Sequence, residues 1–315
     1  MNKQGAITVV SLFSGCGGMD LGFLGGFEFL GEKYKKTNFK IIWANEINAA
    51  ACNTYRKNIG AHIIEGDIRQ AIAALPETAD VVIGGFPCQD ISINGKMAGI
   101  KGKRSGLYTF LVEAVKKIQP KMFIAENVKG LLLKTNAASL QKVLADFNSL
   151  GYNVTYKLYH AADYGVPQTR ERVFIVGACE DVHPFIPPPP VCQKHITVKE
   201  AIGDLETLLP DERFNHIWSY ANKSAEQGDR RLIADRPGYT IRAECHGNIQ
   251  FHYSLPRRIS MREAARIQSF PDTFLFQAKL RETERQIGNA VPPVLAWHIA
   301  NAAQNTITGS QYATK

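Results

Sequence analysis

The sequence predicts an α/β protein with a mostly parallel β-sheet, helices on both faces of the sheet, and a smaller second domain. Over the first 180 residues, segments typical of strands alternate with segments typical of helices, which is the pattern of a parallel sheet. A chain of 315 residues with 45% hydrophobic content can bury one large core and a smaller one. The alternation ends at a proline-rich connector, so we expect the second domain to follow it.

Apolar and amphipathic runs give the order of these elements. The expected strands span residues 7–13, 39–44, 62–65, 81–83, 122–125 and 172–177. The expected helices between them span residues 49–57, 107–118 and 138–150. In an open sheet of this type, ligands bind over the carboxyl ends of the strands.

The chain after residue 180 is organised differently. Pro184 and the prolines at 187–190 form a stiff, extended connector. Residues 181–282 lack the strand–helix rhythm and hold many arginines. The prolines at 292 and 293 then open an apolar helix that runs to about residue 306, and the start of a helix tolerates proline well. We expect residues 1–180, completed by 283–315, to form the first domain and residues 181–282 the second.

Charge and cysteine content narrow the class of protein. A net charge of +8 favours a polyanionic partner over an acidic small molecule. The six cysteines include no C-x-x-C pair, so we expect no metal site, no disulfide framework and a reducing compartment. No apolar run is long enough to span a bilayer, and the amino terminus leads directly into a strand. We therefore expect a soluble, cytoplasmic protein without a membrane partner.

A single cysteine lies in a tight loop after the strand expected at 81–83. Gly84-Gly85 ends that strand, and Pro87 fixes the approach to Cys88, whose sulfur should lie at the carboxyl end of the strand. A loop cysteine in this position is a candidate nucleophile. A small buried thiol is the alternative for an isolated cysteine.

A glycine-rich turn and two acidic residues indicate a cofactor site. The turn at residues 13–18 follows the first strand, and its glycines let the backbone approach a ligand closely. Its spacing differs from the G-x-G-x-x-G fingerprint, which disfavours a nicotinamide or flavin enzyme. Glu46 and Asp67 end the next two strands, where they can accept from ribose hydroxyls and an exocyclic amine or can cap helices. Together these features favour an adenosine-containing cofactor without a pyrophosphate.

These residues belong to an ordered set of motifs that covers nearly the whole chain except about residues 181–255. The motifs are Phe13-Ser14-Gly15-Cys16-Gly17-Gly18, Glu46, Gly66-Asp67-Ile68, Gly85-Phe86-Pro87-Cys88-Gln89, Glu126-Asn127-Val128, Gln168-Thr169-Arg170-Glu171-Arg172, Arg262-Glu263-Ala264-Ala265-Arg266 and Gly288-Asn289. With them the chain resembles the DNA (cytosine-5) methyltransferases, which use S-adenosylmethionine. The resemblance implies a Rossmann-like methyltransferase core at 1–180 and a target-recognition domain at 181–282.

The resemblance also implies a role for each matching residue. Cys88 would be the nucleophile, and Glu126 would contact the target ring. Arg172 would hold the carbonyl of that ring, with Arg170 supporting the site. Around S-adenosylmethionine, or its product S-adenosylhomocysteine, we expect Phe13, Ser14, Gly15, Gly17, Gly18, Glu46, Ile47, Asp67, Ile68, Pro87, Leu107, Asn289 and Ala290. Asn94 departs from the pattern, because many members carry a small hydroxyl residue there.

The reaction explains why these residue types are needed. A thiolate that adds to carbon 6 of cytosine makes carbon 5 nucleophilic toward a methyl sulfonium. Negative charge builds on the ring, and a protonated Glu126 and the Arg172 guanidinium can stabilise it. Taken singly, Glu126 could instead cap a helix, and the arginines could form ion pairs on a strand. The sequence does not identify the base that removes the proton from carbon 5.

Two segments are candidates for DNA binding, since a stacked cytosine must be flipped out of the duplex to react. Residues 89–104 hold several glycines and basic residues and are expected to close over the flipped base, with a plain surface loop as the alternative. Residues 240–251 alternate polar and apolar, which predicts a strand or hairpin with a base-reading or a solvent-facing polar side. Arginines at 257–266 are expected to serve the phosphate backbone and the packing of the smaller domain. The expected DNA-binding residues are Gln89, Ser92, Lys96, Arg104, Thr240, Arg242, Glu244, His246, Asn248, Arg258 and Arg262.

We therefore expect a monomeric enzyme that methylates carbon 5 of cytosine at a short specific site in double-stranded DNA. The resemblance implies a modification enzyme of a restriction–modification system, with a cognate endonuclease that forms no stable complex with it. The alternatives are a tRNA cytosine-5 methyltransferase and a catalytically silent DNA-binding homologue. The sizeable variable region favours duplex DNA over tRNA, and intact Cys88, Glu126 and Arg172 argue against a silent homologue. The recognition sequence is not readable from the chain.

Overall fold

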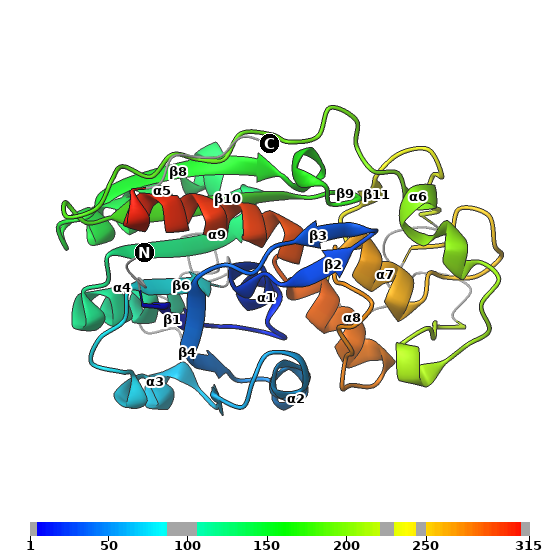
Figure 1. The fold of residues 1–315 in the computed structure, drawn as a ribbon, viewed down its shortest axis with the longest axis horizontal. Helices are drawn as coiled ribbons and strands as arrows, with labels where there is room; N and C mark the ends of the chain where they lie inside the picture. Colours follow the sequence, from blue (N-terminus) through cyan, green and yellow to red (C-terminus); the bar gives the residue numbers. More distant parts are fainter. Residues whose placement is uncertain (1–4, 87–105, 221–229, 244–249, 310–315) are drawn as a thin grey trace.

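The fold is built around a seven-stranded sheet in the order β5–β4–β1–β6–β7–β10–β8 (Figure 1). The computed structural model describes residues 5–86, 106–220, 230–243 and 250–309. The strands are β1 (Ile7–Leu12), β4 (Phe39–Glu46), β5 (Ile63–Glu65), β6 (Val81–Gly85), β7 (Met122–Val128), β8 (Asn153–His160) and β10 (Glu171–Ala178). Neighbours from β5 to β7 are parallel, whereas β10 runs antiparallel to both β7 and β8. The predicted α/β class with a mostly parallel sheet is confirmed.

Helices cover both faces of this sheet. One face carries an apolar cluster with side chains from α1 (Gly18–Leu24), α2 (Ala49–Asn58) and α9 (Pro293–Thr308). The other face carries a second cluster with side chains from α3 (Ile68–Ala71), α4 (Leu107–Ile118) and α5 (Ala137–Asn148). Because successive side chains of a strand point to opposite faces, Val9 joins the first cluster and Val10 the second. Both are fully buried, which is why β1 reads as a continuous apolar run.

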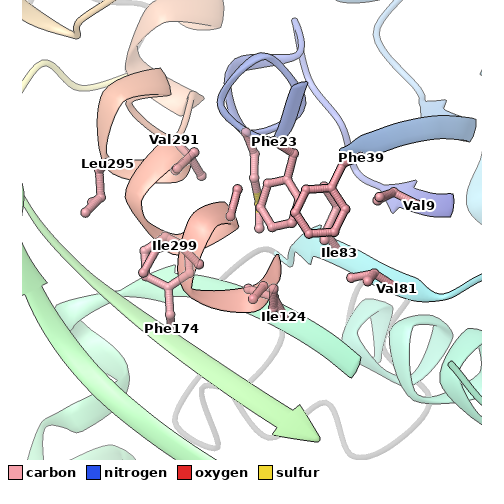
Figure 2. Packing of buried hydrophobic residues seen from close by; sticks show 14 of the residues in the cluster. Val9, Phe23, Phe39, Val81, Ile83, Ile124, Phe174, Val291, Leu295 and Ile299 are labelled. Atoms are coloured by element: carbon pink, nitrogen blue, oxygen red, sulfur yellow. The ribbon is translucent and has the colours of Figure 1, made fainter. Parts of the chain in front are cut away.

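The last helix, α9, returns to the sheet and packs beside α1. Figure 2 shows Leu295 and Ile299 of α9 on the same side of the sheet as Phe23 of α1 and Phe39 of β4. The rings of Phe23 and Phe39 lie 5.1 Å apart between centroids. At Gly22 of α1, an added Cβ would lie only 2.6 Å from the carbonyl oxygen of Pro293, so the two helices are in backbone contact. The carboxyl-terminal segment thus supports the turn between β1 and α1.

A smaller group of elements lies at one end of the sheet (Figure 1). It contains α6 (Val198–Ile202), α7 (Met261–Ile267), α8 (Leu280–Asn289) and the parallel pair β9 (Gln168–Thr169) and β11 (Gly238–Tyr239). Its helices share a third apolar cluster, which also includes Cys16 from the glycine turn. A hairpin of β2 (Phe27–Phe29) and β3 (Glu32–Tyr34) follows α1. The division into domains at 181–282 stays a prediction.

Strand β8 was not predicted from the sequence. Most of its residues are exposed or half-buried, because β8 is the edge strand of the sheet. An edge strand that has one neighbour and a polar outer side lacks the apolar run by which the central strands are recognised.

The strand predicted over residues 240–251 is wrong for the residues of that range that the structure describes. Residues 240–243 and 250 lie in no strand, and Phe251 forms only isolated bridges. The backbone instead bonds to buried side chains: Ile241 donates its N–H to Oε1 of Gln168 at 3.1 Å. Gln250, expected on the polar face, is 6% exposed, and its Nε2 lies 3.3 Å from the carbonyl oxygen of Thr240.

The described part of the chain also bears on the cysteines and on membrane spans. Cys16, Cys52, Cys179 and Cys192 are free thiols. Cys88 and Cys245 lie outside the described residues. Among the helices of the described ranges, not one has the length and apolar character needed to cross a bilayer.

Candidate active site

A cavity of about 880 Å³ opens over the carboxyl ends of the parallel strands. This is the place where an open α/β sheet binds ligands. Of the residues expected to hold the cofactor, those that line the cavity are Phe13, Ser14, Gly15, Gly18, Glu46, Ile47, Asp67, Ile68, Leu107, Asn289 and Ala290. Gly17 is not among the lining residues, and Pro87 lies outside the described residues. Residues 240–243 and the end of α8 form part of the wall.

Glu46 fixes the glycine turn to the end of β4. Its Oε2 accepts a hydrogen bond from the backbone N–H of Gly15 at 3.0 Å, and its Oε1 accepts one from the N–H of Asn48 at 2.8 Å. A carboxylate has about four acceptor sites, so Glu46 keeps capacity for a donor in the cavity. Burial raises the pKa of Glu46, and the hydrogen bonds from these backbone groups oppose that rise. The next residue, Ile47, is 68% exposed and offers an apolar surface beside the cavity.

The turn itself contains strained backbone. Phe13 has a φ of 56°, which a bulky residue rarely adopts. Such conformations cost about 1–3 kcal/mol and are concentrated at ligand sites. Gly17, with φ 93°, is the N-cap of α1, so its part in the turn is to start the helix.

Asp67 caps a helix and also lines the cavity, which are the two roles that the sequence left open. Its side chain caps α3 by accepting from the N–H of Arg69 at 2.9 Å. The Arg69 guanidinium lies 2.8 Å from the other carboxylate oxygen. Asp67 also lines the cavity, so the cap leaves it within reach of a ligand.

Glu126 and Arg172 form a buried ion pair at the cavity wall. Glu126 lies near the end of β7, and Arg172 lies on the adjacent strand β10. Nε of Arg172 donates to Oε1 of Glu126 at 2.8 Å, and the two side chains are 12% and 11% exposed. Burial raises the pKa of Glu126 in spite of the charges of Arg172 and Arg170. Burial also lowers the pKa of Arg172, against the pull of Glu126.

Backbone geometry beside this pair leads the chain toward Cys88. Nδ2 of Asn127 donates to the carbonyl of Phe86 at 3.0 Å, which ties the end of β6 to β7. Gly85 pairs with Glu126 in the register of the two strands. A Cβ at Gly85 would lie 2.9 Å from Oε2 of Glu126, so a side chain at this position would displace the carboxylate. Cys88 itself lies outside the described residues.

Arg170 is buried beneath the site, at 1% exposure. Its Nη1 donates to the carbonyl of Ile241 at 2.9 Å, and its Nη2 donates to those of Gly288 and Ala290 at 2.8 and 3.0 Å. It therefore joins the segment at 240–243 to the end of α8, both of which line the cavity. Arg170 is a positioning residue in this arrangement.

The residues expected to contact DNA fall into three groups. Thr240 and Arg242 line the cavity, and Arg242 is exposed. Arg258 and Arg262 are buried, at 2% and 0% exposure. The remaining expected contacts, Gln89, Ser92, Lys96, Arg104, Glu244, His246 and Asn248, lie outside the described residues.

Burial changes the interpretation of Arg262 and Arg258. The Arg262 guanidinium donates to the carbonyls of Phe214, Pro271 and Phe274 at 3.0, 3.1 and 2.9 Å. A contact to a phosphate requires an accessible donor, so the expectation that Arg262 binds DNA does not hold. Arg258, whose guanidinium carbon lies 4.7 Å from the centre of the Phe251 ring, is likewise a packing residue.

One buried polar network near the site was missed in the sequence. Asp20 of α1 is fully buried and accepts from Tyr55 at 2.9 Å and from Ser11 at 3.1 Å. Ser14 of the glycine turn donates to Ser11 at 2.9 Å. Burial raises the pKa of Asp20 to about 6. An acidic residue in the first turn of a helix reads as a surface residue, and no local pattern signals its burial.

Most of the sequence matches a known family. The sequence model of C-5 cytosine-specific DNA methylases matches residues 7–234 and 218–305. The chain belongs to this family of C-5 cytosine-specific DNA methylases. The predicted resemblance is confirmed, and the protein is a DNA (cytosine-5) methyltransferase. Membership of the family implies S-adenosylmethionine as the methyl donor.

Relatives of this C-5 methylase match along almost its full length. It is 37% identical over 321 residues to the Type II methyltransferase M.NgoFVII of Neisseria gonorrhoeae, and the alignment covers 90% of this chain and 83% of M.NgoFVII. It is 36% identical over 345 residues to M.FnuDI of Fusobacterium nucleatum, covering 98% and 97%. The fold matches a putative DNA modification methyltransferase encoded within a prophage (E. coli) with a TM-score of 0.71 and 23% identity, covering 95% and 99%. Spodoptera frugiperda DNMT2 matches with a TM-score of 0.66 and 15% identity, covering 94% and 99%.

Proposed function

We propose that this methyltransferase transfers a methyl group to carbon 5 of a cytosine flipped out of a short specific site in duplex DNA, through a covalent bond between Cys88 and carbon 6. The observation that carries the proposal is the buried Glu126–Arg172 pair at the wall of the cavity, one strand away from the segment that leads to Cys88. An acid and a cation held together and largely buried at the cavity wall suit a ring that becomes negatively charged.

The cavity residues fit S-adenosylmethionine as the methyl donor. Glu46 keeps acceptor capacity for ribose hydroxyls, and Asp67 lines the cavity where an exocyclic amine could donate to it. Gly15, with nothing within 4 Å of an added Cβ, leaves open space at the turn, and Ile47 offers an apolar face. Bound there, S-adenosylmethionine supplies an electrophilic methyl group on a sulfonium.

The chain's own residues prepare the cytosine. Cys88, as thiolate, adds to carbon 6, and the electron pair of the ring's 5,6 double bond becomes available at carbon 5. Glu126, whose pKa burial raises, donates a proton or hydrogen bond to ring nitrogen 3, while Arg172 donates to the exocyclic oxygen. Once carbon 5 has taken the methyl group, a base removes its proton and the 5,6 double bond re-forms as the thiolate leaves.

The site of action is double-stranded DNA, and the biological role is modification within a restriction–modification system. The relatives M.NgoFVII and M.FnuDI are named Type II methyltransferases, and the chain shares more than a third of its residues with each. A net charge of +8 favours a polyanionic substrate. We propose that Arg242 and Thr240, at the cavity wall, take part in reading the target, and that the enzyme acts as a monomer without a stable endonuclease complex.

Transfer of labelled methyl groups from S-adenosylmethionine tests this function. Wild-type protein should label duplex DNA but not tRNA, and nucleoside mass spectrometry should find 5-methylcytosine. Arg172→Lys should lower the rate by about 10²-fold, because lysine cannot reproduce the guanidinium geometry. Arg213→Lys, on an exposed arginine paired with Asp211, is the matched control and should leave the rate unchanged.

Two results would overturn the proposal. Label that appears on tRNA and not on duplex DNA would assign the other substrate. A rate that stays at the wild-type level in Arg172→Lys would remove the proposed role of the buried pair. If duplex DNA is the substrate, sequencing of the protected DNA gives the recognition site.

A further inference from the structure

Two histidines and an aspartate meet outside the cavity, where the connector after the proline run lies against the turn that follows β8. His160 ends β8, Asp163 lies in the following 3₁₀ turn η5 (Ala161–Tyr164), and His195 lies just before α6. One ligand atom from each of the three lies within 4.8 Å of the others. All three are described residues, and they are absent from the cavity wall.

Both imidazoles converge on one carboxylate oxygen. Nδ1 of His160 lies 3.1 Å from Oδ1 of Asp163, and Nε2 of His195 lies 2.8 Å from the same atom. The ring centroids are 5.6 Å apart. The side chains are 32% exposed for His160 and Asp163 and 39% for His195, so the cluster is open to ions from solvent.

Backbone hydrogen bonds hold this arrangement independently of the three side chains. The N–H groups of Val191 and Cys192 donate to the carbonyl of Asp163 at 2.9 and 3.1 Å. The hydroxyl of Tyr164 donates to the carbonyl of Pro188 at 2.9 Å. Residues 188–192 of the connector are therefore bonded to Asp163 and Tyr164 of η5, which brings the chain that leads to His195 close to Asp163.

We propose that His160, Asp163 and His195 form a binding site for a divalent transition-metal ion, and that Zn²⁺ is its ligand. Two imidazole nitrogens and a carboxylate oxygen are donors that zinc prefers. In a tetrahedral zinc site with bonds of about 2.1 Å, the ligand atoms are about 3.4 Å apart. The separations of 3.1 and 2.8 Å would need to widen by about 0.3 and 0.6 Å, which side-chain rotation can supply.

The donor atoms of the cluster suit a metal ion. Oδ1 of Asp163 and one ring nitrogen of each histidine already face one another at short distance. In the bound state each ring carries its proton on the nitrogen that faces away from the ion, and water takes the fourth position.

The bound ion would stabilise the fold and would take no part in catalysis. It joins the edge strand β8 and η5 to the connector that leads into α6. A ligand that binds only the folded chain stabilises it in proportion to its concentration over its dissociation constant. Zn²⁺ should therefore raise the melting temperature and leave methyl transfer unchanged. This inference does not depend on the proposed DNA substrate.

Zinc binding by the full chain tests the proposal. Protein stripped with a chelator should bind one equivalent of Zn²⁺ in competition with a chromophoric chelator. His195→Gln and Asp163→Asn should each weaken that binding by at least about tenfold, as the loss of a ligand does. His183→Gln, on an exposed histidine outside the cluster, is the matched control and should bind as the wild type does. Circular dichroism checks that each variant is folded.

A second probe keeps the test independent of the variants. Co²⁺ bound by wild-type protein should give the visible absorption of a four-coordinate site, and added Zn²⁺ should remove it. Absence of such a spectrum, or equal zinc affinity in the wild type and His195→Gln, would show a hydrogen-bonded cluster only and overturn the proposal.

Discussion

Replacement of Arg170 by methionine tests whether this side chain joins the two walls of the cavity. Arg170 is 1% exposed, and its guanidinium donates to three carbonyls, those of Ile241, Gly288 and Ala290. Methionine replaces the aliphatic part of the arginine side chain and has a similar volume, but it donates nothing. The variant therefore leaves three carbonyl groups without their donor, while the core keeps most of its volume.

The size of the effect follows from two opposing contributions. Each hydrogen bond from a charged donor contributes about 1.5–3 kcal/mol, so three contribute about 5–9 kcal/mol. Burial of the cation costs several kcal/mol, and the burial that lowers the pKa of Arg170 well below its usual range is a sign of that cost. The difference leaves a loss of about 3 kcal/mol in the free energy of unfolding for Arg170→Met.

Urea denaturation followed by circular dichroism measures this loss, with the slope of the transition as a check that the unfolded state is unchanged. Arg213→Met is the control, because the Arg213 side chain is 91% exposed and its loss should leave the midpoint unchanged. Methyl transfer by Arg170→Met should also fall, since the segment at 240–243 loses its anchor. A midpoint equal to that of the wild type would refute the positioning role of Arg170.

Three further substitutions test other parts of the account. Gly85→Ala should lower methyl transfer by about 10²-fold at unchanged stability, because its Cβ would lie 2.9 Å from Oε2 of Glu126. Gly130→Ala is the control and should be active, because its Cβ meets only a side-chain methyl at 3.6 Å. Equal rates in the two variants would contradict this prediction. Gly288→Ala should weaken DNA binding and stability together, since its Cβ would lie 2.4–2.5 Å from backbone atoms of the segment at 240–243; full stability would count against that close contact. Burial raises the pKa of Asp20 to about 6 in the folded state, so its neutral form stabilises the fold. The free energy of unfolding of the wild type should therefore fall by about 3 kcal/mol as the pH rises from below 4 to above 6, and that of Asp20→Asn should fall much less. Parallel pH profiles of the two proteins in urea denaturation would exclude this.

Much of the fold could be predicted because its signals are local. The strands β1, β6 and β7 are buried on both faces, so each appears as an apolar run, and β4 is buried over most of its length. The glycine turn, Glu46 and Glu126 follow such runs, and the fold brings strand ends to one edge of the sheet. Their meeting at the cavity is a consequence of the topology that the sequence predicts.

The features that were missed depend on partners far along the chain. Arg262 reads as a surface cation, yet carbonyls at 214, 271 and 274 surround it, and only the folded backbone brings them together. The alternation in 240–251 predicts a strand, but Gln168 and Arg170 take up the backbone groups of Ile241 that a strand would have used. The cluster at His160, Asp163 and His195 likewise spans a connector that no local pattern places against β8.

Trapping of the covalent intermediate tests the central claim most directly. A duplex that carries 5-fluorocytosine at the target position accepts the thiolate and the methyl group but has no proton at carbon 5 for a base to remove. Wild-type protein with S-adenosylmethionine should give a protein–DNA adduct that survives a denaturing gel, and Cys88→Ser should give none. No adduct with the wild type, or an equal amount with the variant, would contradict the account.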